Sequence, residues 1–451
     1  MRQRNNERTQ RSVRFLMNSL EILFLTIAFS AVWFSFFRRY VYYYFWGNYL
    51  VVALYAAALI TFNSMYEGFQ LGYKKTGDLI FSQLIALVFS NLLVFLQVTL
   101  TNKHALPAGQ FFFYLVIEIL LVVIANVVLN KIYYSFFPPR KTWLIKGKEK
   151  DDASVQERII RSQANAYRII RQDCFETVKD HLDQIQDYEC IIASGLTPEA
   201  KERLTSFCYE KNKSLYLLPD LYDVIVSNAH HVYLVDTPVL KLNNFGPSQI
   251  AKIMKRIWDI LFSLFFILLT SPIMLMTALL IKLEDGGPVF YCQTRLTQYG
   301  RPFAIIKFRS MRIDAEKDGI ARLAGEHDER ITHIGKTIRA LRIDELPQLL
   351  NILKGDMSVV GPRPERPEIV HTIIKELPEF NYRLKVKAGL TGYAQVYGKY
   401  NTRLRDKLLF DLLYIENFSL LLDIRIMFMT FKILFIKDST EGVDDGQIVN
   451  R

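Results

Sequence analysis

The 451-residue sequence contains few cysteines and lacks the short motifs of the common cofactor sites. Its four cysteines lie far apart, with no CxxC pair and no histidine at metal-ligand spacing, which indicates reduced thiols in a cytosolic setting: Cys174, Cys190, Cys208 and Cys292. A Walker A lysine motif and a protein-kinase signature are also missing, so the sequence does not support simple nucleotide hydrolysis.

The sequence is instead rich in apolar and basic residues. Hydrophobic residues make up 51% of the chain and aromatic residues 13%, which favours a membrane protein. An excess of 56 Lys and Arg over 45 Asp and Glu gives a net charge of +11. That charge suits nucleic acid, an anionic membrane surface or a phosphorylated substrate, and the positions of the charges must decide among them.

Four apolar stretches lie within residues 1–136, at about 15–36, 49–66, 79–100 and 111–129. Each is near the roughly 20 residues that a membrane-spanning helix needs, so we predict four transmembrane helices. Five arginines in the first 14 residues and Lys74-Lys75 place these segments in the cytoplasm by the positive-inside rule, although Arg38-Arg39 weakens the assignment. No signal-peptide cleavage site is evident, so we expect the first helix to remain attached.

Residues 137–245 have the composition of a soluble domain. Short apolar runs such as "TWLIKG", "ECIIAS", "SLYLLP" and "HHVYLVD" alternate with helical patterns such as "DDASVQERIIRSQAN", which predicts a small parallel α/β module of the Rossmann type. After its first strand the chain reads "IKGKEK", without the GxGxxG fingerprint of a dinucleotide site. We therefore favour a structural or regulatory module without a cofactor.

A fifth apolar stretch, at about residues 257–281, is long enough to span a membrane. Length alone favours an ordinary kinked transmembrane helix. However, Pro272 removes a helix hydrogen bond in the middle of the stretch, and Ser271 can satisfy the freed carbonyl. A re-entrant helix that enters one leaflet and returns would also keep the downstream chemistry in the cytoplasm.

The candidate catalytic region, residues 246–451, contains two adjacent acids, Asp344 and Glu345, in "RALRIDELPQLLNIL". One interpretation is structural, with Asp344 as a helix N-cap and Glu345 complementing the helix dipole. The other is catalytic, because basic side chains and glycine-rich loops surround the acids in sequence: Lys307, Arg309, Arg339, Arg342, Arg363 and Arg366, with the loops "GDMSVVGPRPERP" and "KAGLTGYAQV". An ionised nucleophile, cations and close backbone approach are what phosphoryl transfer requires.

Four motifs of this region resemble those of the bacterial sugar transferases that act as polyprenyl-phosphate hexose-1-phosphate transferases, the enzymes that initiate exopolysaccharide, capsule or O-antigen synthesis. They are "KFRSM" (307–311), "RIDELPQLLNILKGDMSVVGPRPE" (342–365), "AGLTGYAQV" (388–396) and "DKLLFDLLYIENFSLLLDIRI" (406–426). The resemblance to the large form of the family implies a membrane protein of α plus α/β class. Its parts would be a four-helix transmembrane bundle, a Rossmann-like module and a mixed α/β catalytic domain on a re-entrant helix broken at Ser271 and Pro272.

The resemblance implies transfer of a sugar-1-phosphate from a UDP-sugar to undecaprenyl phosphate, with release of UMP and a covalent phosphosugar–aspartyl intermediate. Asp344 would be the nucleophile and a ligand of Mg²⁺, and Glu345 would assist the attack of the lipid phosphate or position the metal. The substrate phosphates would be held by Lys307, Arg309, Arg339, Arg363 and, less directly, Arg366. Lys307, Arg309, Asp344, Glu345 and Arg363 lie within the motifs quoted above, and nothing in the catalytic motifs is missing.

The partners implied are a UDP-sugar, undecaprenyl phosphate and the lipid bilayer, without nucleic acid, in a multi-pass protein of the bacterial cell membrane whose catalytic domain faces the cytoplasm. Large interfacial aromatic surfaces would suit a homodimer. Two alternatives remain open, namely a non-catalytic membrane scaffold or regulator of polysaccharide assembly, and an ordinary glycosyltransferase that moves sugar without phosphate. Glucose and galactose are the sugars that the family suggests, and no residue chooses between them.

Overall fold

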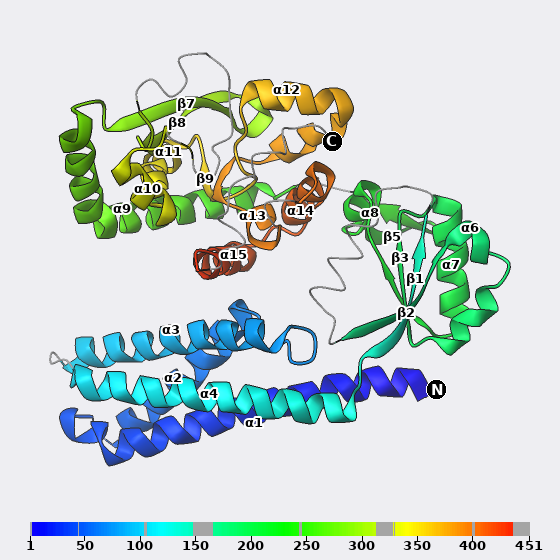
Figure 1. Cartoon of the computed structure of the whole chain (residues 1–451), viewed down its shortest axis with the longest axis horizontal. Helices are drawn as coiled ribbons and strands as arrows, with labels where there is room; N and C mark the ends of the chain where they lie inside the picture. The colour runs from blue at the N-terminus through cyan, green and yellow to red at the C-terminus, as the bar shows by residue number, and fades with distance from the viewer. Residues whose placement is uncertain are drawn as a thin grey trace. The chain divides into compact units, whose positions relative to one another are not determined.

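The computed structural model describes residues 2–43, 45–102, 106–147, 166–242, 246–312, 328, 330–398 and 402–435. The chain divides into two compact units, Met1–Pro219 and Asp220–Arg451. The first contains four long helices followed by an open parallel sheet, and the second contains most of the candidate catalytic motifs (Figure 1). Each unit is described separately below.

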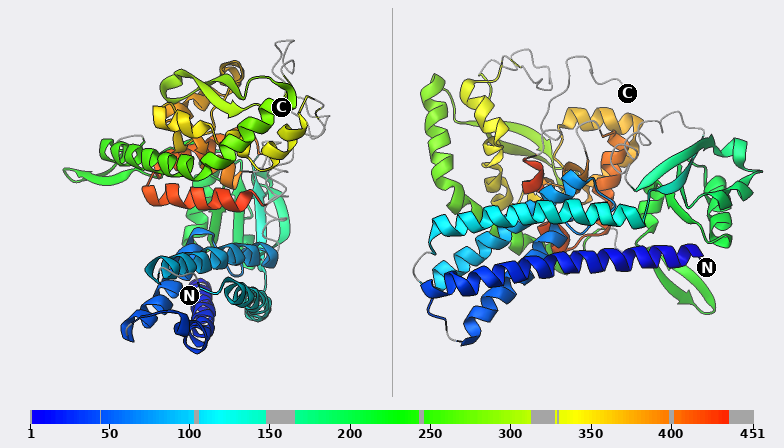
Figure 2. Two further views of the ribbon diagram at one scale, coloured as in Figure 1. Left: turned by 90° about the vertical axis from the view of Figure 1, so that its left-hand side faces the viewer. Right: turned by 60° about the horizontal axis from the view of Figure 1, so that its bottom comes forward.

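The first unit begins with four long helices, α1 (Arg2–Ser35), α2 (Phe45–Met65), α3 (Thr76–Asn102) and α4 (Ala108–Phe136), with a 3-10 turn at Phe37–Tyr40. Consecutive helices pack against each other, and α1 also packs against α4. Figure 2 shows the four helices side by side. All four are long and apolar enough to cross a membrane, as predicted, which identifies a membrane-associated protein.

Aromatic and polar side chains share the interior of these helices. The rings of Phe29 and Tyr55 stack with centroids 4.0 Å apart. Glu118, which is fully buried, accepts hydrogen bonds from the hydroxyls of Tyr55 and Tyr114 and from the Asn91 amide. Because hydrocarbon offers no hydrogen-bonding partner, a carboxyl group at this depth has to be satisfied by neighbouring helices.

The remainder of the first unit is a four-stranded parallel sheet with the order β2-β1-β3-β4. Its strands are β1 (Arg140–Lys146), β2 (Tyr167–Cys174), β3 (Cys190–Ser194) and β4 (Ser214–Leu217), with α6 (Phe175–Val178), a 3-10 segment (Leu182–Asp187) and α7 (Pro198–Glu210) between them. This arrangement confirms the predicted parallel α/β fold. The helix predicted at 151–165 lies outside the described residues.

Gly147 explains in part why β1 is not followed by a dinucleotide-binding loop. A Cβ atom at Gly147 would lie 1.5 Å from the carbonyl oxygen of Gly195, in the loop after β3. The glycine is therefore required for the close approach of two loops of the protein itself. The presence of a glycine at position 147 is thus explained without a bound pyrophosphate.

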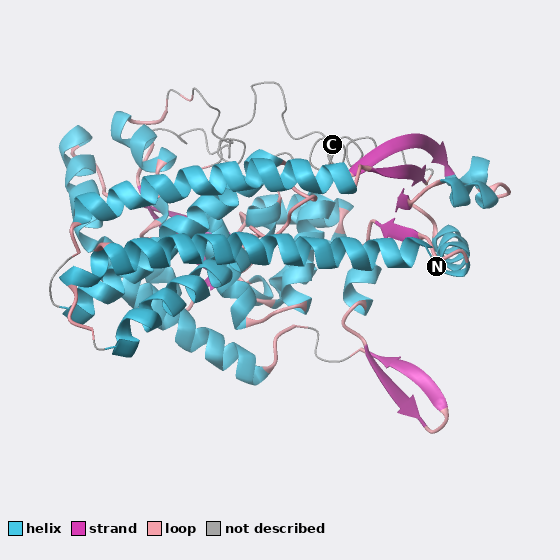
Figure 3. Cartoon of the chain, turned by 90° about the horizontal axis from the view of Figure 1, so that it is seen from below, coloured by secondary structure: helices cyan, strands magenta, loops and turns pink. Residues whose placement is uncertain are grey.

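The predicted strand at "HHVYLVD" forms, but it does not join the parallel sheet. β5 (His230–Leu234) pairs antiparallel with β6 (Thr237–Lys241) in a hairpin of its own, seen in Figure 3 as a two-stranded ribbon. The hairpin and α8 (Leu221–Val226) fall in the second compact unit, where α8 packs against α14 (Leu404–Glu416). The expectation that the strand belonged to the parallel sheet was wrong, because a tight turn pairs it with its sequence neighbour instead.

The second unit is built on α9 (Gln249–Asp285), the fifth helix that is long enough to cross a membrane. Its ribbon bends sharply into two legs (Figure 1), and Pro272 lies within it. The amide-less Pro272 leaves the Leu268 carbonyl without its helical donor, and the Ser271 hydroxyl donates to that carbonyl at 2.8 Å. The bend therefore has an identifiable cause.

Both ends of α9 are attached to the catalytic fold. Near its start, the Arg256 guanidinium donates to the carbonyls of Ile352 and Leu353 at 2.6 and 2.7 Å. At its end, the Glu284 carboxylate accepts from the backbone amide of His333 at 2.8 Å. Between these ends the helix exposes apolar side chains: Leu261, Leu264, Phe265, Leu268, Leu269, Leu275, Met276, Leu279 and Leu280.

The catalytic fold consists of small sheets and short helices. The antiparallel pair is β7 (Phe290–Leu296) and β8 (Pro302–Phe308), and the parallel pair is β9 (Ser358–Val360) and β10 (Gly389–Thr391). The helices are α10 (His333–Ala340), α11 (Gln348–Lys354), α12 (Pro367–Glu376), α13 (Tyr393–Tyr397), α14 and α15 (Leu420–Ile433). Three-residue 3-10 turns lie at Gln298–Gly300 and Ile343–Glu345, and a longer 3-10 segment spans Pro378–Lys385.

The acid of α15, Asp423, points into the protein. The Asp423 carboxylate is fully buried, 2.6 Å from the Lys255 ammonium of α9, and it also accepts from the Tyr414 hydroxyl at 2.8 Å. In contrast, Leu421 and Phe431 are exposed. α15 thus presents apolar residues outward and uses its acid to hold α9 and α14 together.

Candidate active site

Asp344 and Glu345 lie in a one-turn 3-10 segment, Ile343–Glu345, between α10 and α11. The preceding residue, Arg342, has a left-handed backbone with φ of 56°, and Pro347 is the N-cap residue of α11. The interpretation of Asp344 as a helix N-cap was therefore wrong, because the helix begins at Gln348 and no side chain caps it. The turn chemistry of Arg342 and Pro347 separates the acids from α11.

Glu345 is surrounded by cations. Its Oε1 atom lies 3.2 Å from Lys307 Nζ and 3.8 Å from a guanidinium nitrogen of Arg342. Burial alone would raise the pKa of Glu345, but the charges of Lys307, Arg363 and Arg342 outweigh it and lower that pKa to about 2. Glu345 is therefore an anion at every physiological pH.

Asp344 has the opposite shift. Burial, and then the neighbouring charge of Glu345, raise the pKa of Asp344 to about 6 against the opposing effects of Lys307, Arg339 and Arg342. At neutral pH the carboxylate is mostly ionised, but it is destabilised and thus more basic than an ordinary aspartate. Two adjacent acids whose pKa values are pushed apart are typical of sites in which each has its own role.

Hydrogen bonds join α11 to β8, the strand that carries Lys307. The Asn351 amide of α11 donates to the Ala304 carbonyl at 2.8 Å and accepts from the Ile306 amide at 2.9 Å. Asn351 is buried, so both of its polar atoms are satisfied within the protein. Sequence reasoning missed this residue, because nothing local shows that an asparagine of one helix will bind a distant strand.

A buried acid of α9 supports the loop after α11. The Asp259 carboxylate accepts from the Ser358 hydroxyl and from the Val359 amide, both at 3.0 Å. Ser358 and Val359 belong to β9, which leads directly into the loop "GPRPE". Asp259 was also missed, because it lies in an apolar stretch that predicted only membrane contact.

Arg309 lies at the end of β8 but is held by another acid. Its guanidinium forms a two-pronged ion pair with the Asp285 carboxylate at the end of α9, with one N–O distance of 2.7 Å. Gly287 packs against this pair, since a Cβ atom there would lie 2.6 Å from the guanidinium. The structure thus gives Arg309 an anchoring contact, while its assignment as a phosphate ligand remains a prediction.

The other predicted cations differ in their closeness to the acids. Arg339, in the last turn of α10, is among the charges that act on Asp344, and the exposed Arg363 is among those that act on Glu345. Arg366 is the N-cap residue of α12. The structure therefore brings Lys307, Arg339 and Arg363 into electrostatic range of the acids.

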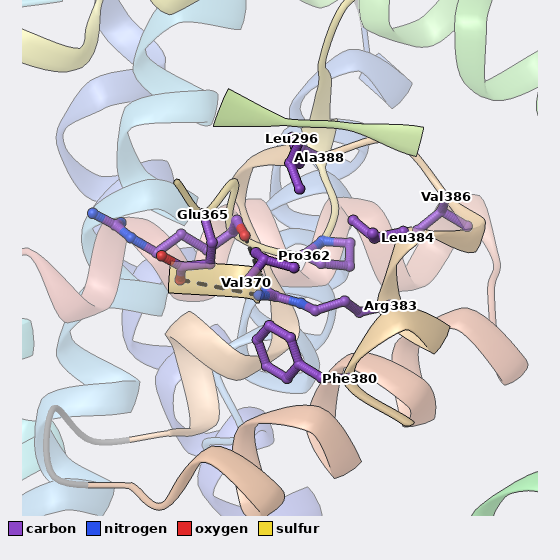
Figure 4. Close-up of a pocket in the computed structure, with 10 residues that line it drawn as sticks. Leu296, Pro362, Glu365, Val370, Phe380, Arg383, Leu384, Val386 and Ala388 are labelled. Atoms are coloured by element: carbon purple, nitrogen blue, oxygen red, sulfur yellow. Dashed lines mark hydrogen bonds and ion pairs between the residues drawn. The ribbon is translucent and has the colours of Figure 1, made fainter. Parts of the chain in front are cut away.

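Arg383 binds the backbone of the loop that contains Arg363. The Arg383 guanidinium donates to the Arg363 carbonyl at 2.9 Å and pairs with the buried Asp411 of α14 at 2.9 Å. It also reaches Glu365, 4.0 Å away, across a small, mostly apolar pocket (Figure 4). Asp344 and Glu345 do not line this pocket, so it is the support of the loop rather than the reaction centre.

The predicted glycine-rich loops approach each other closely. A Cβ atom at Gly389 would lie 2.1 Å from the Gly361 amide nitrogen, and one at Gly392 would lie 2.2 Å from the Gly361 carbonyl oxygen. Their lack of side chains is therefore required by the packing of the β9 and β10 ends. This contact explains these glycines without a bound phosphate.

The donor set suits a metal ion that is held largely by its substrate. Within the described residues no group of three or more His, Cys, Asp or Glu side chains forms a metal cage. Mg²⁺ is usually bound through one or two carboxylates plus substrate phosphates, and Asp344 offers a basic carboxylate that is destabilised by burial and by Glu345. The residues present therefore fit a magnesium ion shared with a diphosphate.

Comparisons with known proteins place this site in context. Residues 250–437 match the family model described as bacterial sugar transferase. The chain is 42% identical over 234 residues to a UDP-N-acetylgalactosamine-undecaprenyl-phosphate N-acetylgalactosaminephosphotransferase of Aeromonas hydrophila, covering 51% of this chain and 54% of that protein. It is 35% identical over 222 residues to a UDP-glucose:undecaprenyl-phosphate glucose-1-phosphate transferase of Escherichia coli, covering 48% of each.

A shorter relative is covered almost completely. The exopolysaccharide production protein PSS of Rhizobium leguminosarum is 41% identical over 193 residues, which are 93% of that protein and 40% of this chain. The chain spans about half the length of the longer curated relatives described above. The similarity to the family model falls on the second compact unit, which carries the acids, the cations and α9.

Proposed function

Because this chain belongs to the bacterial sugar transferase family, we propose that it transfers a sugar-1-phosphate from a UDP-sugar to undecaprenyl phosphate and releases UMP. The observation that carries the proposal is the pair of adjacent acids with opposite pKa shifts in a ring of cations. One acid is basic enough to attack phosphorus, and the other is a permanent anion. The product would be an undecaprenyl-diphosphate-sugar, the first membrane intermediate of exopolysaccharide or capsule synthesis.

Asp344 is the nucleophile of the first step. One of its carboxylate oxygens bonds to the β-phosphorus of the UDP-sugar, while the bond from that phosphorus to the bridging oxygen breaks. UMP leaves with the bridging oxygen and its electron pair, so the sugar phosphate becomes attached to Asp344. In the second step an oxygen of undecaprenyl phosphate bonds to the same phosphorus, and Asp344 leaves as a free carboxylate.

The surrounding cationic side chains stabilise the negative charge of the phosphate groups during both steps. Lys307, Arg339 and Arg363 bind phosphate oxygens, with Arg309 and Arg366 as further candidates. A Mg²⁺ ion held by Asp344 and by the diphosphate would neutralise the charge that develops on the leaving phosphate. Glu345 stays ionised beside Lys307, where it keeps that ammonium oriented and helps to place the incoming lipid phosphate.

A re-entrant α9 is the arrangement that the contacts favour. The start and the end of the helix both bind the same catalytic fold, through Arg256 and Glu284. A helix tied to one domain at both ends cannot place those ends on opposite sides of a bilayer. The catalytic unit thus faces the cytoplasm. The helices α1–α4 form a transmembrane bundle with an even number of crossings, so the chain that leaves α4 is also on the cytoplasmic side.

The decisive experiment follows the covalent intermediate. Purified full-length protein is incubated with a UDP-sugar labelled at the β-phosphorus, without lipid acceptor, and protein-bound label is measured after rapid quenching. Label should appear on the wild type and on Glu376→Gln, an exposed acid of α12 used as a matched control. Asp344→Asn should bind substrate but retain no label, because an amide is not a nucleophile here.

The released nucleotide separates the alternatives. UMP should appear in step with the label, and addition of undecaprenyl phosphate should discharge it. Release of UDP would indicate an ordinary glycosyltransferase. An Asp344→Asn variant that fully restores polysaccharide synthesis in cells would indicate a scaffold or regulator, and the proposed chemistry would then be wrong.

A further inference from the structure

A groove lies between the start of α3 and the last turns of α4, entirely within the first unit. It is lined by Thr76, Val127, Asn130, Lys131, Tyr134 and Pro139. Both helices are long and apolar enough to cross a membrane, and the groove lies at one end of them. We refer to it as the α3–α4 groove.

The α3–α4 groove contains a buried acceptor without a donor. Asn130 is 3% exposed, and its Nδ2 atom donates to the Asn126 carbonyl at 3.1 Å, which fixes the orientation of the amide. Its Oδ1 atom has no hydrogen-bond partner among the described residues. A buried amide oxygen without a donor is unfavourable, so a ligand with an N–H or O–H group would be stabilised there.

The rim of the α3–α4 groove favours an anion. Lys131 is exposed beside Asn130, and Thr76 is the first residue of α3, a helix of 27 residues whose dipole attracts negative charge and whose first turn contains one acid, Asp78. A lysine and a helix N-terminus are together suited to a phosphate group. Asn130 lines the groove together with these two residues.

An apolar stripe on α4 leads to the α3–α4 groove. Ile124, Val127 and Val128 are exposed, and Lys131 follows them on the same helix face at the spacing of three and four residues. Hydrocarbon chains pack on such a surface, and a lysine one turn beyond it is typical of the membrane interface. Along the helix the hydrocarbon surface is therefore followed by Asn130, which has the buried hydrogen-bond acceptor, and then by the cation Lys131.

We propose that the α3–α4 groove binds the head group of a membrane phospholipid that carries a hydrogen-bond donor, such as the ammonium of phosphatidylethanolamine. The phosphate lies against Lys131 and the start of α3, the donor bonds to Asn130 Oδ1, and the acyl chains follow the stripe that ends at Val128. The site requires only that α3 and α4 are in a membrane. It does not depend on the transferase reaction.

The test compares two lipids that differ only in the donor. Delipidated full-length protein is titrated with phosphatidylethanolamine and with phosphatidylcholine, which has the same phosphate but no N–H, and bound lipid is counted by native mass spectrometry. Wild-type protein should bind the first more tightly. Lys131→Gln should weaken binding of both lipids about fivefold, the effect expected for one interfacial lysine, while Lys375→Gln, an exposed lysine of α12, should change neither.

Asn130→Leu supplies the second comparison. It should remove the preference for phosphatidylethanolamine while leaving binding of phosphatidylcholine unchanged. Equal affinity of the wild type for both lipids would overturn the proposal whether or not this variant folds, and so would a Lys131→Gln effect no larger than that of Lys375→Gln. Preferential binding of an undecaprenyl-diphosphate-sugar over both phospholipids would also overturn it, and would assign the groove to the lipid-linked product instead.

Discussion

Replacing Asp344 by asparagine should inactivate the enzyme and at the same time stabilise its fold. Asparagine has the shape of the protonated acid and carries no charge. The pKa of Asp344 is raised from 3.8 to about 6, mainly by burial and then by Glu345, so ionising this side chain in the folded protein is unfavourable. The neutral amide removes that penalty.

The size of the effect follows from the pKa shift. Because an acid with a raised folded pKa destabilises the protein once it ionises, the penalty is absent below the unfolded pKa near 4, grows between pH 4 and 6, and is complete above pH 6. It amounts to roughly 2 to 3 kcal/mol at pH 7. For a unit of this size that corresponds to a rise in Tm of about 4 to 10 °C.

The neighbouring acid provides a control of opposite sign. The pKa of Glu345 is lowered from 4.5 to about 2, so its charge contributes stability that is complete above pH 5 and is lost as the pH falls through 2. Glu345→Gln should therefore destabilise the protein at pH 7 by a similar amount. Both variants change a carboxylate into an amide of the same shape, one residue apart.

The assay is thermal unfolding of the full-length protein in detergent at pH 7.5 and pH 4.5, with catalytic activity measured in parallel. Asp344→Asn should raise Tm at pH 7.5 and by much less at pH 4.5, while Glu345→Gln should lower it at both. A Tm of Asp344→Asn at or below that of the wild type at pH 7.5 would refute the reasoning. An equal stabilisation at both pH values would do so too, because it would show a packing effect without titration.

Four further predictions concern the reaction and the topology. UMP release should fall about tenfold between pH 7 and pH 5, because Asp344, with a pKa of about 6, must be ionised to attack; a flat profile would contradict this. Chelation of divalent cations should abolish UMP release, and added Mg²⁺ should restore it, whereas full activity in the chelator would exclude the metal. Arg383→Lys should keep a cation beside Asp411 but lose the bond to the Arg363 carbonyl, lowering kcat/KM roughly tenfold with little change in Tm, as steady-state kinetics can measure. The exposed Cys292, just after α9, should react with a membrane-impermeant maleimide only after cells are permeabilised, and labelling of intact cells would exclude the re-entrant arrangement.

Sequence patterns predicted the elements that depend on local periodicity. The apolar stretches of residues 1–136 gave four helices, and the alternation of short apolar runs with polar helices gave a parallel sheet. The local cause of the bend in α9 was also visible in the sequence, because the missing amide of proline and the nearby hydroxyl are both local features. In each case the information lies within a few residues of where the structure uses it.

The contacts that assemble the site were not predictable in this way. Asn351 binds a strand almost 50 residues earlier, and Asp259 binds β9 about 100 residues later, with no local sign of either partner. The turn at Arg342 was mistaken for a helix start because an acid before an apolar helix is usually a cap. The position of the acids therefore depends on long-range hydrogen bonds and on the left-handed backbone of Arg342, and neither is evident from local sequence.

Among the charges that lower the pKa of Glu345, Lys307 has the largest effect. Lys307 Nζ lies 3.2 Å from Glu345, so the nearest cation stabilises that acid first, while Asp344 has the repulsion of an ionised neighbour in addition to its burial. Since Lys307 is also a proposed phosphate ligand, a bound diphosphate has to share it with Glu345. Sharing weakens the hold of Lys307 on Glu345 and brings two anions to one cation, which is the situation in which a divalent ion binds most favourably. We therefore expect the site to bind a divalent metal ion together with its substrate.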